Sequence, residues 1–182
     1  MNAIHRLIGM GGDQLVRELL GHDSPAATAA RPRRYSELMG DIRAFPGSRE
    51  LLQRIHDLGL AVVLATSAPA DELAQLREVL GADDAIDGQT TADDVANSKP
   101  DPEVFVKAME NASIDPRRAI AIGDSVWDIR AARSAGIACI TVESGGFSQH
   151  ELSEAGAARV YRDVSELLSQ LFTGPVASLL AT

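Results

Sequence analysis

Two aspartates that follow an apolar stretch near the middle of the chain could together hold a metal ion. The segment IAIGDSVWD, residues 120–128, predicts a buried strand that ends at Asp124, with Asp128 one helical turn further on. The spacing of four places both carboxylates on the same side of the start of the next helix. Such a pair can bind a hard divalent cation such as Mg²⁺, which prefers oxygen ligands and keeps several waters. A second interpretation fits the pattern equally well: Asp124 only caps the helix, and Asp128 is a solvated acid in its first turn.

Two further loops carry residues that could bind a phosphate group. Thr66 and Ser67 follow the apolar run LAVVLA, residues 60–65, and would present hydroxyl groups and free backbone amides at a helix N-terminus, which is a natural anion site. Hydroxyl residues also cap helices routinely, so capping is the simpler interpretation of this pair taken alone. Lys99 lies in the segment SKPDP, residues 98–102, where two prolines stiffen the backbone. A rigidly held lysine can neutralise phosphate charge, although most single lysines are only solvated surface charges.

Helical and apolar patterns alternate along the chain and predict an α/β fold. We predict helices over residues 12–20, 35–39, 49–58, 70–80, 102–111, 125–135, 149–155 and 164–172. We predict strands over residues 60–65, 85–86, 119–122, 137–142 and 159–161, the first of them buried on both faces. The segment DSPAATAARPRR, residues 23–34, is interpreted as a linker between two helices. This alternation predicts a mainly parallel sheet covered by helices on both faces, with ligands at the carboxyl ends of the strands.

The order of these segments resembles the haloacid dehalogenase-like hydrolase superfamily. An apolar strand followed by Thr66, a later Lys-Pro-Asp-Pro, and an apolar strand followed by Gly-Asp-x-x-x-Asp occur in this order over nearly the whole chain. The pattern is most similar to the phosphatases with a helical cap, such as phosphoglycolate phosphatase and β-phosphoglucomutase, and implies a Rossmann-like core. The resemblance implies that Thr66 and Ser67 bind the phosphate and that Lys99 steadies both nucleophile and phosphate. Asp124 and Asp128 are then the implied ligands of Mg²⁺.

The resemblance also divides the chain into parts. Residues 1–44 are expected to form a partial helical cap, residues 45–172 the α/β core, and residues 173–182 a C-terminal tail. Within the expected cap, a turn that would face the substrate is formed by Gly9, Met10, Gly11 and Gly12.

Members of the superfamily begin with an apolar strand that ends in Asp-x-Asp-x-Thr, and this chain contains no such segment. The first of those aspartates attacks phosphorus and the second acts as general acid and base. Without the attacking carboxylate no aspartyl-phosphate can form, and the remaining groups can hold a phosphate but cannot displace its leaving group. The implied function is Mg²⁺-dependent hydrolysis of a small phosphorylated metabolite, with a mutase sharing the same machinery. The alternative is a catalytically inactive phosphate-binding or interaction module.

The resemblance implies that the missing first strand would lie at the centre of the sheet, between the strands that end at Thr66 and Asp124. Its absence leaves facing rows of unpaired backbone groups, each costing about 1–3 kcal/mol if buried without a partner. Three outcomes follow: the sheet closes over the gap, a partner or second copy supplies the strand, or the protein is longer than this chain. We expect the third outcome, because the other site residues are all in place.

Composition limits the remaining classes of function. The 182 residues are 45% hydrophobic and carry a net charge of −9, which disfavours nucleic acids and anionic membranes as partners. No segment approaches the roughly 18 apolar residues of a membrane span. The single cysteine, Cys139, cannot form an internal disulfide, so a cytoplasmic location is expected. The partner implied by the resemblance is a small phosphorylated metabolite.

Overall fold

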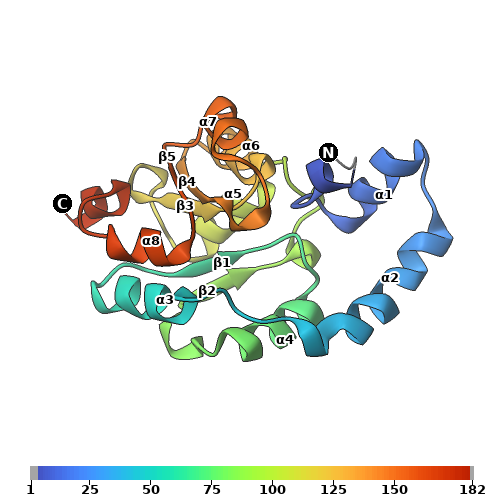
Figure 1. Ribbon diagram of the computed structural model, residues 1–182, viewed down its shortest axis with the longest axis horizontal. Helices are drawn as coiled ribbons and strands as arrows, with labels where there is room; N and C mark the ends of the chain where they lie inside the picture. The colour runs from blue at the N-terminus through green and yellow to red at the C-terminus, as the bar shows by residue number, and fades with distance from the viewer. Residues whose placement is uncertain (1–3, 181–182) are drawn as a thin grey trace.

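The computed structural model describes residues 4–180 and contains two parallel sheets, each with helices packed against it (Figure 1). The first sheet has the order β1-β2 and the second the order β3-β4-β5. The strands are β1 (Val63–Ala65), β2 (Gly88–Thr90), β3 (Ile120–Gly123), β4 (Ala138–Val142) and β5 (Arg159–Tyr161). In register, Val63 lies opposite Gly88, and Ile120 opposite Ala138. The predicted α/β class with parallel strands is confirmed.

Eight α-helices surround these strands (residues 4–180 considered). They are α1 (Gly12–Leu20), α2 (Pro25–Leu38), α3 (Ser48–Asp57), α4 (Ala70–Leu80), α5 (Glu103–Asn111), α6 (Val126–Ser134), α7 (Gln149–Ala155) and α8 (Val164–Ser169). Short 3₁₀ turns join them, as in η3 (Asp83–Ala85), and one of them, η7 (Pro175–Leu180), ends the described chain. In the described part of the chain, none of the helices has the length and apolar character needed to span a bilayer.

The core forms on both faces of the three-stranded sheet because side chains alternate along a strand. On one face, Cys139 of β4 packs with Ile129 of α6 and Leu152 of α7. On the other, Ile140 packs with residues of α3 and α8, including the fully buried Leu167. Helix α5 contacts both strands of the two-stranded sheet. Helices therefore cover both faces of the larger sheet, as predicted.

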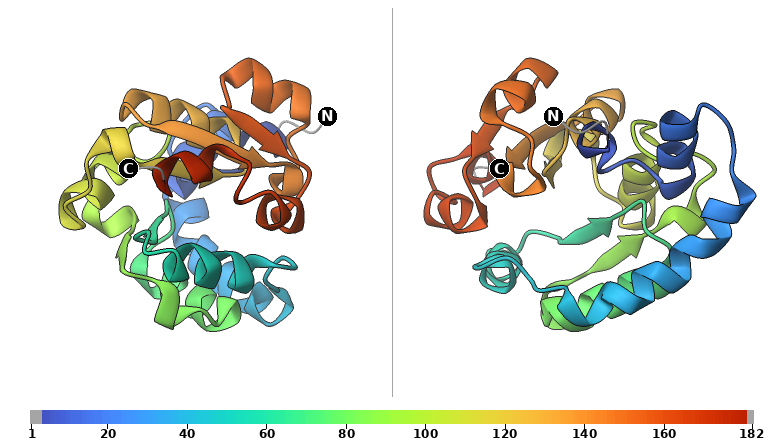
Figure 2. Two further views of the ribbon diagram at one scale, coloured as in Figure 1. Left: turned by 90° about the vertical axis from the view of Figure 1, so that its left-hand side faces the viewer. Right: turned by 45° about the vertical axis from the view of Figure 1, so that its right-hand side comes forward.

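Four elements differ from the sequence-based prediction. Residues 23–34 are not a linker, because α2 runs through them as one helix along the side of the molecule (Figure 2). This helix begins with Ser24 as N-cap, whose Oγ accepts from Ala27 N at 3.3 Å, and it tolerates Pro32 in its interior. Alanine-rich composition favours a helix even with one such proline. Residues 83–85 form the 3₁₀ turn η3, with the strand three residues later, and α8 ends at Ser169 rather than at residue 172.

The fourth difference concerns the apolar run at residues 60–65. Only Val63–Ala65 form strand β1, and all three residues are half-buried rather than buried on both faces. The physical reason is that β1 has β2 on one side only, among the described residues. Its other edge, and the facing edge of β3, border a cavity of about 760 Å³ that we call the inter-sheet groove. The sheet therefore does not close over the gap.

The ends of the described chain pack on the rest of the protein. Trp127 Nε1 of α6 donates to Arg6 O at 3.1 Å, and Val176 of η7 is buried beside Leu171. An ion pair between Arg31 of α2 and the buried Glu72 of α4 joins the expected cap to the core. The division at residues 44 and 172 stays a prediction.

Truncating one side chain of the core tests this packing. Leu152 is fully buried in α7, whereas Leu38 at the end of α2 is 60% exposed. We expect Leu152→Ala to lower the free energy of unfolding by about 2–5 kcal/mol, because it removes buried apolar contacts and leaves a cavity. The matched variant Leu38→Ala should change it by no more than about 0.5 kcal/mol. Urea denaturation followed by circular dichroism measures both, and equal effects would contradict the packing described.

Candidate functional site

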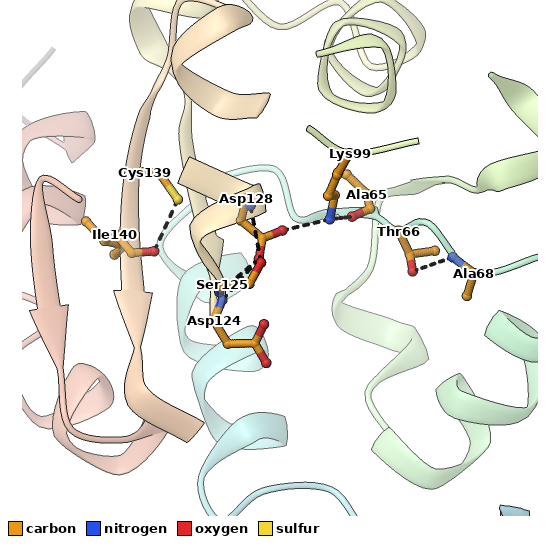
Figure 3. Close-up of polar contacts among 9 residues, drawn as sticks. All are labelled: Ala65, Thr66, Ala68, Lys99, Asp124, Ser125, Asp128, Cys139 and Ile140. Atoms are coloured by element: carbon orange, nitrogen blue, oxygen red, sulfur yellow. Dashed lines mark hydrogen bonds and ion pairs between the residues drawn. The ribbon is translucent and has the colours of Figure 1, made fainter. Parts of the chain in front are cut away.

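The side chain of Lys99 joins the carboxyl ends of two strands that belong to different sheets. Its ammonium donates to Ala65 O at the end of β1 at 3.1 Å, and to Asp128 Oδ1, just after β3, at 2.8 Å (Figure 3). Both charged side chains are buried, with Lys99 8% and Asp128 6% exposed. Because parallel strands end at the same edge, Lys99 marks the edge where ligands bind in such folds.

A capping box at the start of α6 fixes the carboxylate of Asp128. Ser125 is the N-cap, and Asp128 Oδ2 accepts hydrogen bonds from Ser125 Oγ at 2.6 Å and from Ser125 N at 3.1 Å. The backbone N of Asp124 also donates to Asp128 Oδ2, at 3.3 Å. The interpretation of Asp124 as helix cap and Asp128 as solvated acid is therefore wrong. Ser125 was not among the site residues predicted from the sequence, although the Ser-x-x-Asp spacing before a helix is itself a capping signal.

The protein shifts the pKa values of the two aspartates in opposite directions. Burial alone would raise the pKa of Asp128, but the Lys99 ammonium and the hydrogen bonds from Ser125 and Asp124 hold that pKa below its ordinary value. For Asp124, burial raises the pKa, and the neighbouring charge of Asp128 raises it further. Asp128 is thus a paired anion, whereas Asp124 has no comparable cation at its side chain.

Asp124 has the free oxygens that a cation would need. Among residues 4–180, no other residue donates a hydrogen bond to its carboxylate, which lies apart from the hydrogen-bonded cluster in Figure 3. Gly145 lies against it, so closely that a Cβ there would be 2.6 Å from the Asp124 Cγ. No group of three or more His, Cys, Asp or Glu side chains gathers within residues 4–180. Asp124 itself offers one carboxylate with free oxygens, which suits Mg²⁺, because this ion binds through one or two carboxylates and keeps several waters.

Asp128 could contact such a cation only by giving up part of its present hydrogen bonding. Each of its oxygens already accepts from Lys99 or from the capping box. Its place as a direct metal ligand stays a prediction, while the structure assigns it the positioning of Lys99.

The hydroxyl pair after β1 does not cap the next helix. The N-cap of α4 is Pro69, which has no side-chain cap, so the capping interpretation of Thr66 and Ser67 is wrong. Thr66 Oγ1 accepts from Ala68 N at 3.1 Å, in a local turn beside the Lys99 contact (Figure 3). Ser67 Oγ is buried and finds no hydrogen-bond partner within residues 4–180, an arrangement that is costly unless a ligand or water supplies one.

The glycine-rich turn at residues 9–12, with Met10 half-buried within it, packs next to these groups. A Cβ on Gly9 would be 2.6 Å from Ser125 Oγ, so only glycine fits there, with φ at +99°. Gly11 lies more tightly still against Ser98, the residue before Lys99, and a Cβ on Gly12 would be 2.9 Å from Arg31 Nε. The turn therefore adjoins both Lys99 and the capping box, while its contact with a substrate stays a prediction.

Cys139 lies on the far side of Asp128, within β4, and takes no part in this edge. It is 4% exposed, and its Sγ donates to Ile140 O at 3.6 Å (Figure 3). Burial raises the pKa of its thiol to about 12, so the reactive thiolate is scarce at neutral pH. The role of a small core residue, expected from the sequence, agrees with this.

Comparison with known proteins identifies the family. A sequence model of haloacid dehalogenase-like hydrolases matches residues 2–136. The chain belongs to the haloacid dehalogenase-like hydrolase family. It is 35% identical to protein CbbY of Cereibacter sphaeroides, over 92% of this chain and 79% of that protein. It is 28% identical to a phosphoglycolate phosphatase of Rhodospirillum rubrum, over 91% of this chain and 73% of that enzyme.

Solved structures of the family share the fold. The crystal structure of a hydrolase from Pseudomonas syringae matches with a TM-score of 0.85 and 33% identity, covering 92% of this chain and 80% of that one. The family and the phosphatase branch that the sequence resembled are therefore confirmed.

The opposite pKa shifts of the two aspartates predict opposite pH effects on stability. An acid whose pKa is raised by folding opposes folding once it ionises, so in a chelator Asp124→Asn should stabilise the protein at pH 7. This gain should vanish as the pH falls below the ordinary aspartate pKa of 3.8.

Asp128→Asn is the matched control, because its pKa is lowered by folding. It should destabilise the protein at pH 7 by about 3 kcal/mol, since Lys99 is left buried without its partner. Part of that loss should disappear as the pH falls, because the native carboxylate is then itself protonated. Urea denaturation at pH 7, 5 and 3.5 measures both variants. Effects of the same sign at pH 7 would contradict the electrostatics described.

Proposed function

We propose that this chain carries the phosphate-binding and Mg²⁺-binding groups of a phosphatase that acts on a small phosphorylated metabolite. The observation that carries the proposal is the buried contact of Lys99 with Ala65 O and Asp128 Oδ1. It fixes one ammonium group between the end of β1, which Thr66 follows, and Asp128, which lies one helical turn after Asp124. A fixed cation beside a hydroxyl group and a free carboxylate suits a phosphate monoester and its counter-ion.

The relatives support this class of substrate. Those similar to this chain include phosphoglycolate phosphatases and a phosphorylated carbohydrates phosphatase of Thermotoga maritima, to which it is 33% identical over 107 residues. All of these names describe small phosphorylated compounds as substrates.

Each residue of the edge has a role in the proposal. Lys99 neutralises charge on the phosphate oxygens, and the Thr66 hydroxyl donates a hydrogen bond to one of them. Ser67, whose hydroxyl has no partner in the structure, adds a second donor. When bound, Mg²⁺ supplies charge neutralisation and orients the phosphate, and Asp124 is the residue that holds it.

The displacement of the leaving group needs a nucleophile that these 182 residues do not provide. The sequence contains no Asp-x-Asp, so no carboxylate of this motif can form an aspartyl-phosphate. This observation favours a second candidate function, a module that binds phosphate without hydrolysing it. The two candidates share the binding groups and differ in the chemical step alone.

Binding of the cation and of phosphate tests the shared part. At a Mg²⁺ concentration 100-fold above its dissociation constant, the protein should gain about 2.7 kcal/mol of stability, and Asp124→Asn should lose this gain. With Mg²⁺ present, Lys99→Met should weaken binding of inorganic phosphate at least about tenfold, because a fixed charge is removed. The matched control is Lys107→Met, which removes the other lysine of the chain from α5. Urea denaturation with and without Mg²⁺ measures the gain in stability, and calorimetric titration measures phosphate binding. Unchanged phosphate affinity in Lys99→Met would contradict the proposal.

Hydrolysis distinguishes the two candidates. If the site belongs to a phosphatase, a version of the protein extended by an apolar strand that ends in Asp-x-Asp should release phosphate from p-nitrophenyl phosphate in Mg²⁺. The same extension ending in Asn-x-Asn should be inactive, because an amide is not the required nucleophile. An extended protein that folds, binds Mg²⁺ and releases no phosphate from any phosphomonoester would favour the binding module.

A further inference from the structure

Thr141 is a fully buried threonine whose hydroxyl group takes no part in holding the fold together. It lies in β4, one residue before the strand ends, and 0% of its surface is exposed. Its Oγ1 finds no hydrogen-bond partner in the part of the chain that the structure describes. A buried hydroxyl group without a partner destabilises a protein, so its presence calls for an explanation.

The register of the sheet places Thr141 beside the end of β3. Thr141 lies opposite Gly123, the last residue of β3, and opposite residues of paired strands point to the same face of the sheet. This is the face on which Cys139 packs against α6 and α7, because side chains two residues apart on a strand share a face. The side chain of Thr141 therefore lies on the α6 side of the sheet, at its carboxyl end.

The carboxylate of Asp128 fills the space next to Thr141 on this face. A Cβ built on Gly123 would be 2.7 Å from the Asp128 Cγ and 2.9 Å from its Oδ2, so the Asp128 side chain takes the place of a side chain at residue 123. Paired strands are about 4.8 Å apart, which puts Thr141 one strand spacing from this carboxylate. The pKa of Cys139 agrees with this placement, because burial and then the charge of Asp128 raise it.

Thr141 approaches Asp128 from the side opposite to Lys99. The Lys99 ammonium bonds to Asp128 Oδ1 and to Ala65 O of β1, which lies across the inter-sheet groove from β3. Strand β4 pairs with the other edge of β3. Figure 3 shows Cys139 and Ile140 of β4 on one side of Asp128 and Lys99 on the other. A donor on β4 therefore does not compete with Lys99 for the same oxygen.

A cation at Asp124 would change the hydrogen bonding that Asp128 needs. Asp128 Oδ2 accepts from Ser125 Oγ, Ser125 N and Asp124 N, which leaves no place for another donor. An Asp128 that turns an oxygen toward a cation beside Asp124 leaves part of this capping box and needs a replacement donor. Among the buried hydroxyl groups without a partner in residues 4–180, only that of Thr141 lies on a strand paired with β3.

We propose that Thr141 is a positioning residue whose hydroxyl group donates a hydrogen bond to the Asp128 carboxylate when Mg²⁺ binds at Asp124. The inference deepens the proposed function and rests on it, because it concerns the same Mg²⁺ site. The hydrogen bond replaces one that Asp128 gives up and provides the buried hydroxyl group with a partner. The hydroxyl group therefore lowers stability in the absence of Mg²⁺ and raises the affinity for it.

Two substitutions separate the hydroxyl group of Thr141 from its methyl group. Thr141→Val replaces the hydroxyl group by a methyl group, and Thr141→Ser keeps the hydroxyl group alone. In a chelator, the urea midpoint should rise in Thr141→Val, which has no unpaired hydroxyl group, and fall in Thr141→Ser, which loses a buried methyl group.

Mg²⁺ binding should rank the same variants in the opposite order. In calorimetric titration, Thr141→Val should weaken Mg²⁺ binding at least about fivefold, because the hydrogen bond to a charged group is lost. Thr141→Ser should retain the affinity of the unsubstituted protein within about twofold. A residue that only packs the core would lower stability and affinity together.

Thr90→Val is the matched control. Thr90 is also 0% exposed, ends the parallel strand β2, and has an Oγ1 without a partner in the described chain. Thr90→Val should raise the urea midpoint, as Thr141→Val does, and leave Mg²⁺ affinity unchanged. In threonine-labelled protein, the NMR signal of the Thr141 methyl group should shift as Mg²⁺ is added, whereas that of Thr90 should stay. This measurement uses the unsubstituted protein, so it decides the question even if a variant fails to fold.

The outcomes distinguish this inference from the proposed function. If the unsubstituted protein binds Mg²⁺ and Thr141→Val binds it equally well, the role of Thr141 is wrong and the proposed function stands. An equal loss of affinity in Thr141→Val and Thr141→Ser, or in Thr141→Val and Thr90→Val, would also overturn it, because packing would then be the cause. So would a Thr141 methyl signal that stays in place as Mg²⁺ binds. If the unsubstituted protein binds no Mg²⁺, the proposed metal site and this inference fail together.

Discussion

The buried contact between Lys99 and Asp128 holds the two sheets in a fixed relation. Lys99 reaches the end of β1 through Ala65 O, and Asp128 begins the helix that follows β3. In the described part of the chain, β1 and β3 share no backbone hydrogen bonds. The contact between Lys99 and Asp128 instead links the carboxyl ends of these two strands. Two charges taken out of water stabilise a fold only when their hydrogen bonding is nearly complete. The capping box of Ser125 completes it on the aspartate side.

The functional groups are arranged around that bridge. Because Asp128 is fully engaged by Lys99 and Ser125, the neighbouring Asp124 is left with free oxygens at the same edge. One motif thus produces a carboxylate that positions a cationic side chain and another that we propose as the ligand of a metal ion. The inter-sheet groove reaches this bridge, because Ala65, Thr66 and Lys99 are among its lining residues.

Local patterns in the sequence predicted the elements whose signals are local. Helices α4 and α7 have the expected bounds, since apolar spacing and a terminal glycine, Gly81 or Gly156, decide them. The first part of helix α2 was missed because turn residues and small side chains suggested a linker. The burial of Lys99 could not be predicted, because its partners come from segments about thirty residues away on either side. The short, half-buried β1 likewise depends on a neighbour that is absent among the described residues rather than on its own apolar sequence.

The central claim is that Lys99 and Asp128 act as one coupled unit across the two sheets. A double-mutant cycle on the free energy of unfolding, with Lys99→Met, Asp128→Asn and the double variant, measures that coupling most directly. The account predicts that each single substitution costs about 3 kcal/mol and that the double variant costs less than their sum by at least about 1 kcal/mol. If the cost of the double variant equals the sum of the two single costs within about 0.5 kcal/mol, the two side chains act independently, which would contradict this coupling.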